Sequence, residues 1–189
     1  MSIVNTSGRV TADEFLVHAA ATGTSELVRG EIRMMSPAGG AHGIIVLNLV
    51  RALDAFVEEH RLGQCFADGT GFLLPGLGDT VRSPDVAFVR AGQLPDQGLG
   101  RGWVRVAPDL AVEVLSPDER TTELEEKLSD YWAAGTRLAW VVDPAWRGVT
   151  VRSPSGAQRR LSESETLDGG DVLPGFSLPV SRLFERVAR

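Results

Sequence analysis

The segment 110–115 reads Leu-Ala-Val-Glu-Val-Leu, an apolar run interrupted by one ionisable side chain, that of Glu113. An apolar run of this length is typical of a strand buried on both faces of a sheet. A carboxylate within such a strand is costly unless it is paired, binds a metal ion or reaches an open edge, because an unpaired buried charge loses its hydration. The chain must therefore fold around a strand whose charged group needs a partner.

A second acid, Asp85, directly precedes another short apolar segment, residues 86–89. Two acids on apolar strands can converge on one divalent cation, and Mg²⁺ favours oxygen ligands, usually one or two carboxylates with water and substrate phosphate. An aspartate beside a strand is also a common turn former. The pattern leaves both roles open for Asp85, and the pair of Asp85 and Glu113 is the candidate metal site.

Lys127 is the only lysine of the chain; since lysine and arginine together number 19, the other 18 basic residues are arginine. Lysine is a compact charge whose pKa responds to burial, whereas arginine stays protonated. Glu123, Lys127 and Tyr131 recur every four residues on one side of an expected helix. Lys127 therefore either forms a surface pair with Glu123 or, if the helix packs beside segment 110–115, points at the Glu113 site. Tyr131 is expected to pack with its hydroxyl in water.

The 189 residues are expected to form a single domain over residues 25–189, preceded by a helical extension over residues 1–24. The net charge of −6 and the pI of about 5.1 argue against a broad basic surface for nucleic acid, but not against a local groove lined by arginine. The single Cys65 excludes an internal disulfide, and a cytoplasmic location is expected. We expect no membrane contact, because no apolar run has the length of a membrane span.

Expected helices and strands follow one another irregularly along the chain. Thr11 and Glu14 have the spacing of a capping box, so a short helix should begin there. Longer helices are expected over residues 43–60 and 122–134, the first with an apolar stripe that should pack on a sheet. That stripe comprises Val46, Leu49, Val50, Leu53 and Val57. Strands are expected over residues 26–35 (with a turn at Gly30), 64–74, 85–89, 110–115, 138–142 and 149–152, followed by an irregular cap over residues 173–184. Several strands lack a helix between them, which favours an α+β fold, a mixed α/β arrangement.

Short motifs recur along the chain in a definite order. They are ELVRGEI (26–32), MSP (35–37), AHG (41–43), SPDVAFV (83–89), PDLAVEVLSP (108–117), Glu123 with Lys127, Tyr131 and Gly135, WVVDP (140–144) and LPGF (173–176). In order and spacing these motifs resemble the Uma2 family, also called DUF820, within the PD-(D/E)XK nuclease superfamily. The resemblance runs from about Ser25 to Phe184, nearly the whole chain.

The resemblance implies a restriction-endonuclease-like core, in which a mixed central sheet is flanked by helices. Asp85 corresponds to the motif aspartate and Glu113 to the second acid. The wider superfamily has a lysine two residues after that acid, where this chain has Leu115, and the lysine expected in this family lies on the next helix, at Lys127. Glu31 is expected to supply a further acid near the metal. His42 is interpreted as a helix-capping or surface residue.

The function expected from this resemblance is Mg²⁺-dependent (or Mn²⁺-dependent) endonucleolytic hydrolysis of nucleic acid, with DNA as the expected partner. Asp85 and Glu113 would hold the metal ion, and Lys127 would orient or deprotonate the attacking water or neutralise charge in the transition state. Two alternatives are a nuclease-fold binding or regulatory protein with little catalysis, and a nuclease for RNA or a small phosphodiester. A homodimer is possible on either view.

Overall fold

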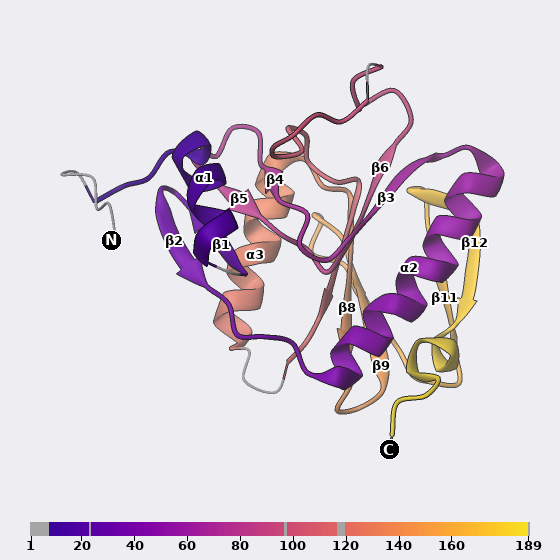
Figure 1. Ribbon diagram of the computed structural model, residues 1–189. Coiled ribbons are helices and arrows are strands. Elements are labelled where there is room, and N and C mark those ends of the chain that lie inside the picture. Colours follow the sequence, from indigo (N-terminus) through magenta and orange to yellow (C-terminus); the bar gives the residue numbers. More distant parts are fainter. Residues whose placement is uncertain (1–7, 23, 97, 117–119, 189) are drawn as a thin grey trace.

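The computed structural model describes residues 8–22, 24–96, 98–116 and 120–188, and of residues 18–22 only the backbone. Its helices are α1 (Ala12–Thr22), α2 (Gly40–His60) and α3 (Thr121–Ala134), followed by a 3₁₀-helix, η1 (Val180–Phe184). The chain runs from α1 through three sheets and ends beside α2 (Figure 1). The observed order of mixed helices and strands agrees with the α+β arrangement expected from the sequence.

A six-stranded mixed sheet forms the centre of the molecule, in the order β10-β9-β8-β7-β6-β3. Its strands are β3 (Gly63–Ala67), β6 (Val86–Arg90), β7 (Leu110–Val114), β8 (Leu138–Asp143), β9 (Gly148–Arg152) and β10 (Gln158–Leu161). Within this sheet β7 and β8 are paired in parallel, and the other neighbours are antiparallel. Parallel neighbours need a crossover connection, and α3 supplies it between β7 and β8.

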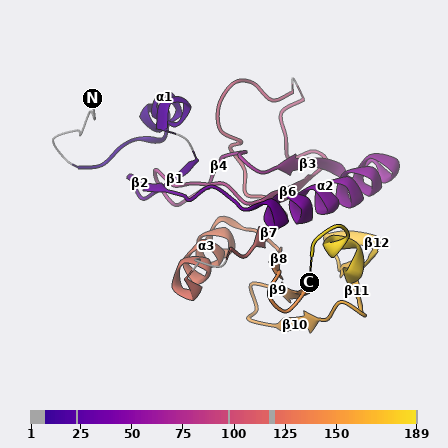
Figure 2. The same cartoon turned by 60° about the horizontal axis from the view of Figure 1, so that its bottom comes forward.

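Helices α2 and α3 lie against opposite faces of this sheet (Figure 2). Val112 and Val114 of β7 belong to the core cluster that contains the buried side of α2. Ala111, the residue before Val112, belongs to the cluster that contains Leu124 and Leu128 of α3. Because side chains alternate along a strand, Glu113 projects toward the α3 layer.

A smaller sheet and α1 pack beside the central sheet. The strand order of the smaller sheet is β2-β1-β5-β4. Its strands are β1 (Ser25–Val28), β2 (Glu31–Met34), β4 (Phe72–Leu73) and β5 (Val81–Arg82). The turn between β1 and β2 has positive φ at both Arg29 and Gly30, the conformation of a tight primed hairpin turn. The predicted capping box is confirmed, because Thr11 and Glu14 exchange hydrogen bonds at the start of α1.

Two expectations about local structure were wrong. The stretch 64–74 is not one strand: β3 belongs to the large sheet and β4 to the small one, with a turn between them. The tail is regular rather than irregular, since β11 (Thr166–Gly169) pairs with β12 (Leu173–Pro179) before η1. Phe176 of β12 stacks on Trp140 in the core, 5.6 Å between ring centroids.

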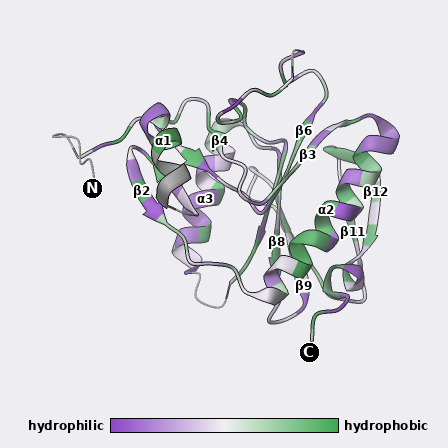
Figure 3. Cartoon of the chain, viewed as in Figure 1, coloured by the Kyte–Doolittle hydropathy of each residue, from purple (hydrophilic) through white to green (hydrophobic). Residues whose placement is uncertain are grey.

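Helix α2 is the element among the described residues that is long and apolar enough to suit a membrane span by length and composition alone. Hydrophobic and hydrophilic residues alternate along it in Figure 3. The predicted stripe is confirmed as a core face: Val46, Leu49, Leu53 and Val57 are buried, and Val50 is partly buried against the same cluster. The apolar character of α2 is thus accounted for by packing on the central sheet.

We predict that Leu49→Ala lowers the free energy of unfolding by about 2–5 kcal/mol, because it leaves a cavity under α2. Leu47, on the same helix, is 43% exposed, so Leu47→Ala should cost less than about 1 kcal/mol. Urea unfolding followed by tryptophan fluorescence measures both. Equal losses at the two positions would contradict the assignment of the buried face.

Candidate active site

The buried carboxylate of Glu113 is held by two residues of α3. Lys127 donates from Nζ to Oε2 over 2.9 Å, and Tyr131 donates from its hydroxyl to Oε1 over 2.7 Å. Lys127 and Tyr131 are the only lysine and the only tyrosine in the chain. Glu113 itself is 3% exposed. The buried carboxylate within the apolar strand is therefore paired with a cation, Lys127, and a hydroxyl, Tyr131, and both belong to α3.

The packing of α3 explains why these two side chains reach the sheet. Leu124 and Leu128 are buried in the core beneath the helix. Lys127 and Tyr131 follow at the i, i+3, i+4 and i+7 positions that share one helical face. The Lys127 side chain is only 11% exposed, which excludes the alternative of a solvated surface pair with Glu123. The expectation of a solvated Tyr131 hydroxyl was also wrong, because the residue is fully buried.

Asp85 lies directly across from Glu113. The register of β6 and β7 pairs Val86 with Val112, and its continuation by one residue places Asp85 opposite Glu113. Asp85 Oδ2 accepts a hydrogen bond from the backbone N–H of Val114 over 2.6 Å. The structure thus brings together Asp85, Glu113 and Lys127, three of the four site residues expected from the sequence.

His42 joins the site from the first turn of α2. Its Nε2 lies 3.2 Å from Asp85 Oδ1, and its side chain is mostly buried. The hydrogen bond with Asp85 raises the pKa of His42 above its ordinary value. The sequence interpretation as a capping or surface residue missed this contact, since α2 begins at Gly40 rather than at residue 43. The available signal was the AHG motif at residues 41–43.

The fourth expected residue, Glu31, does not reach this cluster. It is exposed on β2, where it pairs with Val28 across the hairpin. The acid that the hairpin contributes near the site is Glu26, which is buried and accepts hydrogen bonds from Arg82 and from the backbone N–H of Ser83. Placing Glu31 beside the acids was therefore not supported by the geometry.

Burial dominates the electrostatics of Glu113 and raises the pKa of its carboxyl to about 7. Lys127 and the Tyr131 hydroxyl lower this pKa, while the carboxylates of Asp85 and Glu26 raise it. Burial and the adjacent Glu113 likewise raise the pKa of Tyr131 well above its ordinary value, so Tyr131 acts as a neutral hydrogen-bond donor. A further positive charge at the site would favour the ionised form of Glu113.

The donor set suits a hydrated hard cation better than a closed protein cage. Among the residues that the structure describes, no three side chains of His, Cys, Asp or Glu form a group that could hold a metal ion. Asp85 and Glu113 are opposite each other when the β6–β7 register is continued, and their oxygens retain acceptor capacity beyond the described hydrogen bonds. Mg²⁺ is commonly held by one or two carboxylates and keeps several waters, which fits Asp85 and Glu113.

The fold and these acids define a restriction-endonuclease-like protein. The family profile for Uma2, described as "Putative restriction endonuclease", matches residues 12–181, and the chain belongs to this family. The fold resembles a crystal structure from Anabaena variabilis ATCC 29413, described as a "putative nuclease belonging to DUF820". The TM-score is 0.81 at 23% identity, over 93% of this chain and 98% of the other. No curated protein matches the sequence.

This membership confirms the family and the fold expected from the sequence. Proteins of the restriction-endonuclease-like class generally use a divalent metal ion, and a nuclease acts on nucleic acid. Asp85, Glu113 and Lys127 are the residues of this chain to which such chemistry would belong.

We predict that the stability of the metal-free protein falls, relative to Glu113→Gln, as pH rises from 5 to 8. The folded pKa of Glu113 is raised, so its stabilising contribution is complete below the unfolded pKa and is lost as pH rises through about 7. One such group gives a slope of at most about 1.4 kcal/mol per pH unit. Urea titrations in a chelator measure it.

The matched control is Glu123→Gln, an exposed position on α3. It makes the same chemical change on the helix surface and should follow the parent at every pH. A stability difference between parent and Glu113→Gln that does not vary with pH would contradict the environment described for Glu113.

Proposed function

We propose that this protein is a Mg²⁺-dependent endonuclease that hydrolyses phosphodiester bonds of nucleic acid, with DNA as the substrate and Mn²⁺ able to replace Mg²⁺. The observation that carries the proposal is the buried Glu113 opposite Asp85, with Lys127 bonded to it, in a chain of the Uma2 family. The proposal includes a cytoplasmic location and is compatible with a homodimer.

Each residue of the site would have a distinct task. Asp85 and Glu113 would hold the divalent ion, which when bound lowers the pKa of a water and stabilises charge on a phosphate. Lys127 would orient the attacking water or neutralise charge that develops on the phosphate. Tyr131 fixes the Glu113 carboxylate through Oε1, and His42 fixes the Asp85 carboxylate through Oδ1. These contacts preorganise the two acids before substrate arrives.

A binding or regulatory role without catalysis is the alternative that one observation favours. Both Glu113 oxygens already accept hydrogen bonds, from Lys127 and from Tyr131. A protein that used this carboxylate only to fasten α3 to the sheet would have the same contacts. The two functions differ in metal binding, because only the nuclease needs a cation between Asp85 and Glu113.

We predict that the protein nicks supercoiled plasmid in Mg²⁺ or Mn²⁺, and that Glu113→Gln and Asp85→Asn each lower the rate by at least about 100-fold. The amide side chains keep the shape but lose the negative charge that holds a cation. Cleavage of supercoiled, linear and single-stranded DNA and of RNA, with and without chelator, identifies the substrate. Glu123→Gln serves as the control with the same change of charge.

Calorimetric titration of Mg²⁺ and Mn²⁺ is run beside the cleavage assay. Binding that depends on both acids, together with cleavage, is the expected result. A well-folded parent that neither binds the ions nor cleaves any of these nucleic acids would favour the non-catalytic alternative.

We further predict that Lys127→Arg loses most of this cleavage although the charge is kept. The guanidinium is larger and planar and does not give up a proton at working pH, and the Lys127 side chain is almost enclosed. Arg137→Lys, at an exposed position after α3, is the reciprocal control and should cleave normally. Full activity of a folded Lys127→Arg would show that charge alone suffices at this position.

A further inference from the structure

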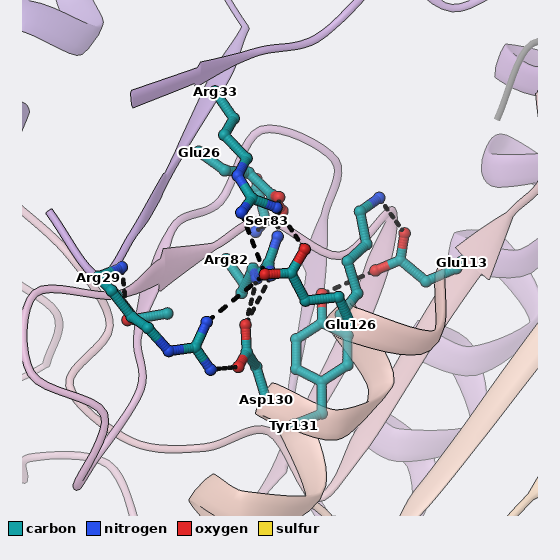
Figure 4. A network of polar contacts seen from close by, with 11 residues as sticks. Glu26, Arg29, Arg33, Arg82, Ser83, Glu113, Glu126, Asp130 and Tyr131 are labelled. Atoms are coloured by element: carbon teal, nitrogen blue, oxygen red, sulfur yellow. Dashed lines mark hydrogen bonds and ion pairs between the residues drawn. The ribbon is translucent and has the colours of Figure 1, made fainter. Parts of the chain in front are cut away.

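A buried ionic network lies beside the site and joins β5, β1 and α3 (Figure 4). At its centre is Arg82, which is only 2% exposed. Its Nη1 donates to Glu26 over 2.7 Å, and its Nε and Nη2 donate to one oxygen of Asp130 over 2.9 and 2.6 Å. Burial lowers the pKa of Arg82, but the carboxylates of Glu26 and Asp130 outweigh it and raise that pKa. Arg82 is therefore a permanently charged group shared by two buried acids.

The α3 helix presents two neighbouring pairs of polar side chains, each spaced by four residues. Glu126 and Asp130 face the arginines of the smaller sheet, whereas Lys127 and Tyr131 face Glu113. The pairs are offset by one residue, so a rotation or slide of α3 that broke the first set of contacts would also displace the second. The network and the site are thus coupled through one rigid helix.

The outer part of the network, formed by Arg29 and Arg33, is exposed to solvent and constrains α3 less than Arg82 does. Arg29 donates to the second oxygen of Asp130 over 2.6 Å, and Arg33 bonds to Glu126, but both arginine side chains are about half exposed. Exposed ion pairs are screened and contribute little, whereas removing one partner of a buried pair leaves an uncompensated charge. The constraint on α3 therefore resides mainly in Arg82.

The same arginine is connected to the other side of the site. Glu26 accepts from Arg82 through Oε2 and from the backbone N–H of Ser83 through Oε1, over 2.9 Å. Ser83 lies two residues before Asp85. The Glu26–Arg82 pair consequently fixes the segment that leads into Asp85, while the Arg82–Asp130 pair fixes the helix that carries Lys127 and Tyr131.

We propose that Arg82 is a positioning residue, which acts through Asp130 and Glu26 to hold Lys127 and Tyr131 on Glu113. Apolar packing by Leu124 and Leu128 attaches α3 to the sheet but tolerates small shifts, whereas a forked guanidinium between two acids selects one orientation. The expected effect of Arg82 on cleavage rests on the proposed nuclease function. Its expected effect on the positions of Lys127 and Tyr131 does not.

The chain offers a direct measurement of this geometry, because it has one lysine and one tyrosine. Incorporation of ¹³Cζ-tyrosine and ¹³Cε-lysine gives one NMR signal each, from Tyr131 and Lys127. In the parent, Glu113→Gln should shift both signals, since both side chains bond to that carboxylate. The size of this response reports whether the two contacts exist.

Two variants test Arg82. Arg82→Lys keeps one charge but loses the fork. The triple variant Glu26→Gln, Arg82→Met, Asp130→Asn removes all three charges, so that no buried charge is left alone and the fold can persist. In both, the Tyr131 and Lys127 signals are expected to move, and their response to Glu113→Gln should fall to less than half. A folded triple variant with parental signals and a parental response would overturn the proposal.

The control is the pair Arg152→Met with Glu125→Gln, which removes an ion pair between β9 and the outer side of α3. It should leave both signals and their response unchanged. Equal effects from this control would show that α3 responds to the loss of any ion pair, and would also overturn the specific role of Arg82.

Where the parent cleaves nucleic acid, Arg82→Lys should lower kcat by about 10- to 100-fold and leave KM within about twofold, because Arg82 is 2% exposed and therefore out of reach of a bound substrate. If the parent does not cleave, the proposed function fails, but the NMR response still decides the positioning role. An unchanged kcat together with an unchanged NMR response would reject the inference while leaving the nuclease function intact.

Discussion

The structure depends on one buried carboxylate. Glu113 is the fourth of the five residues of β7, a strand between β6 and β8, and it is 3% exposed. Its charge requires a cation and hydrogen-bond donors close by, and α3 supplies them from Lys127 and Tyr131. The parallel pairing of β7 with β8 requires a crossover connection, and that connection is α3, the helix that carries both partners.

Several acids lie near Glu113, and together with burial they raise the pKa of its carboxyl. Asp85 faces Glu113 across the strands, Glu26 lies beyond it, and burial disfavours every added negative charge. The protein offsets this accumulation with Arg82 and Lys127, and with His42 on Asp85. A divalent ion held by Asp85 and Glu113, as in the proposed function, would add to this compensation. Under that proposal, stability and ion binding would depend on the same few groups.

Much of the fold was predictable because strong periodicity and capping signals determine it locally. The stripe of α2, the capping box of α1 and the apolar run of β7 each carry their own signal. The two-residue strands β4 and β5 carry none, since pairing with distant strands defines them. The β11–β12 hairpin is local, but its strands contain Gly169, Pro174 and Gly175 and lack a clear apolar alternation, so the sequence did not reveal it.

The candidate site was predictable where a charged residue interrupts an apolar run or where a residue type is unique, as with Glu113 and Lys127. It was not predictable where partners are remote. Glu26 and Glu31 lie on the same face of the hairpin, but Glu26 is buried on the inner strand β1 and Glu31 is exposed on the edge strand β2. His42 reaches Asp85 only through the packing of α2. The role of Arg82 depends on Asp130, 48 residues further along the chain.

The separation along the chain has a consequence for synthesis on the ribosome. Glu26 and Arg82 are made well before Asp130, and Glu113 precedes Lys127 by 14 residues. Until α3 has emerged, Glu113 lacks its cation Lys127, and Arg82 lacks Asp130, one of its two acids. Because long-range contacts of this kind are slow to form, we expect the α3 side of the core to close only after this helix has been synthesised.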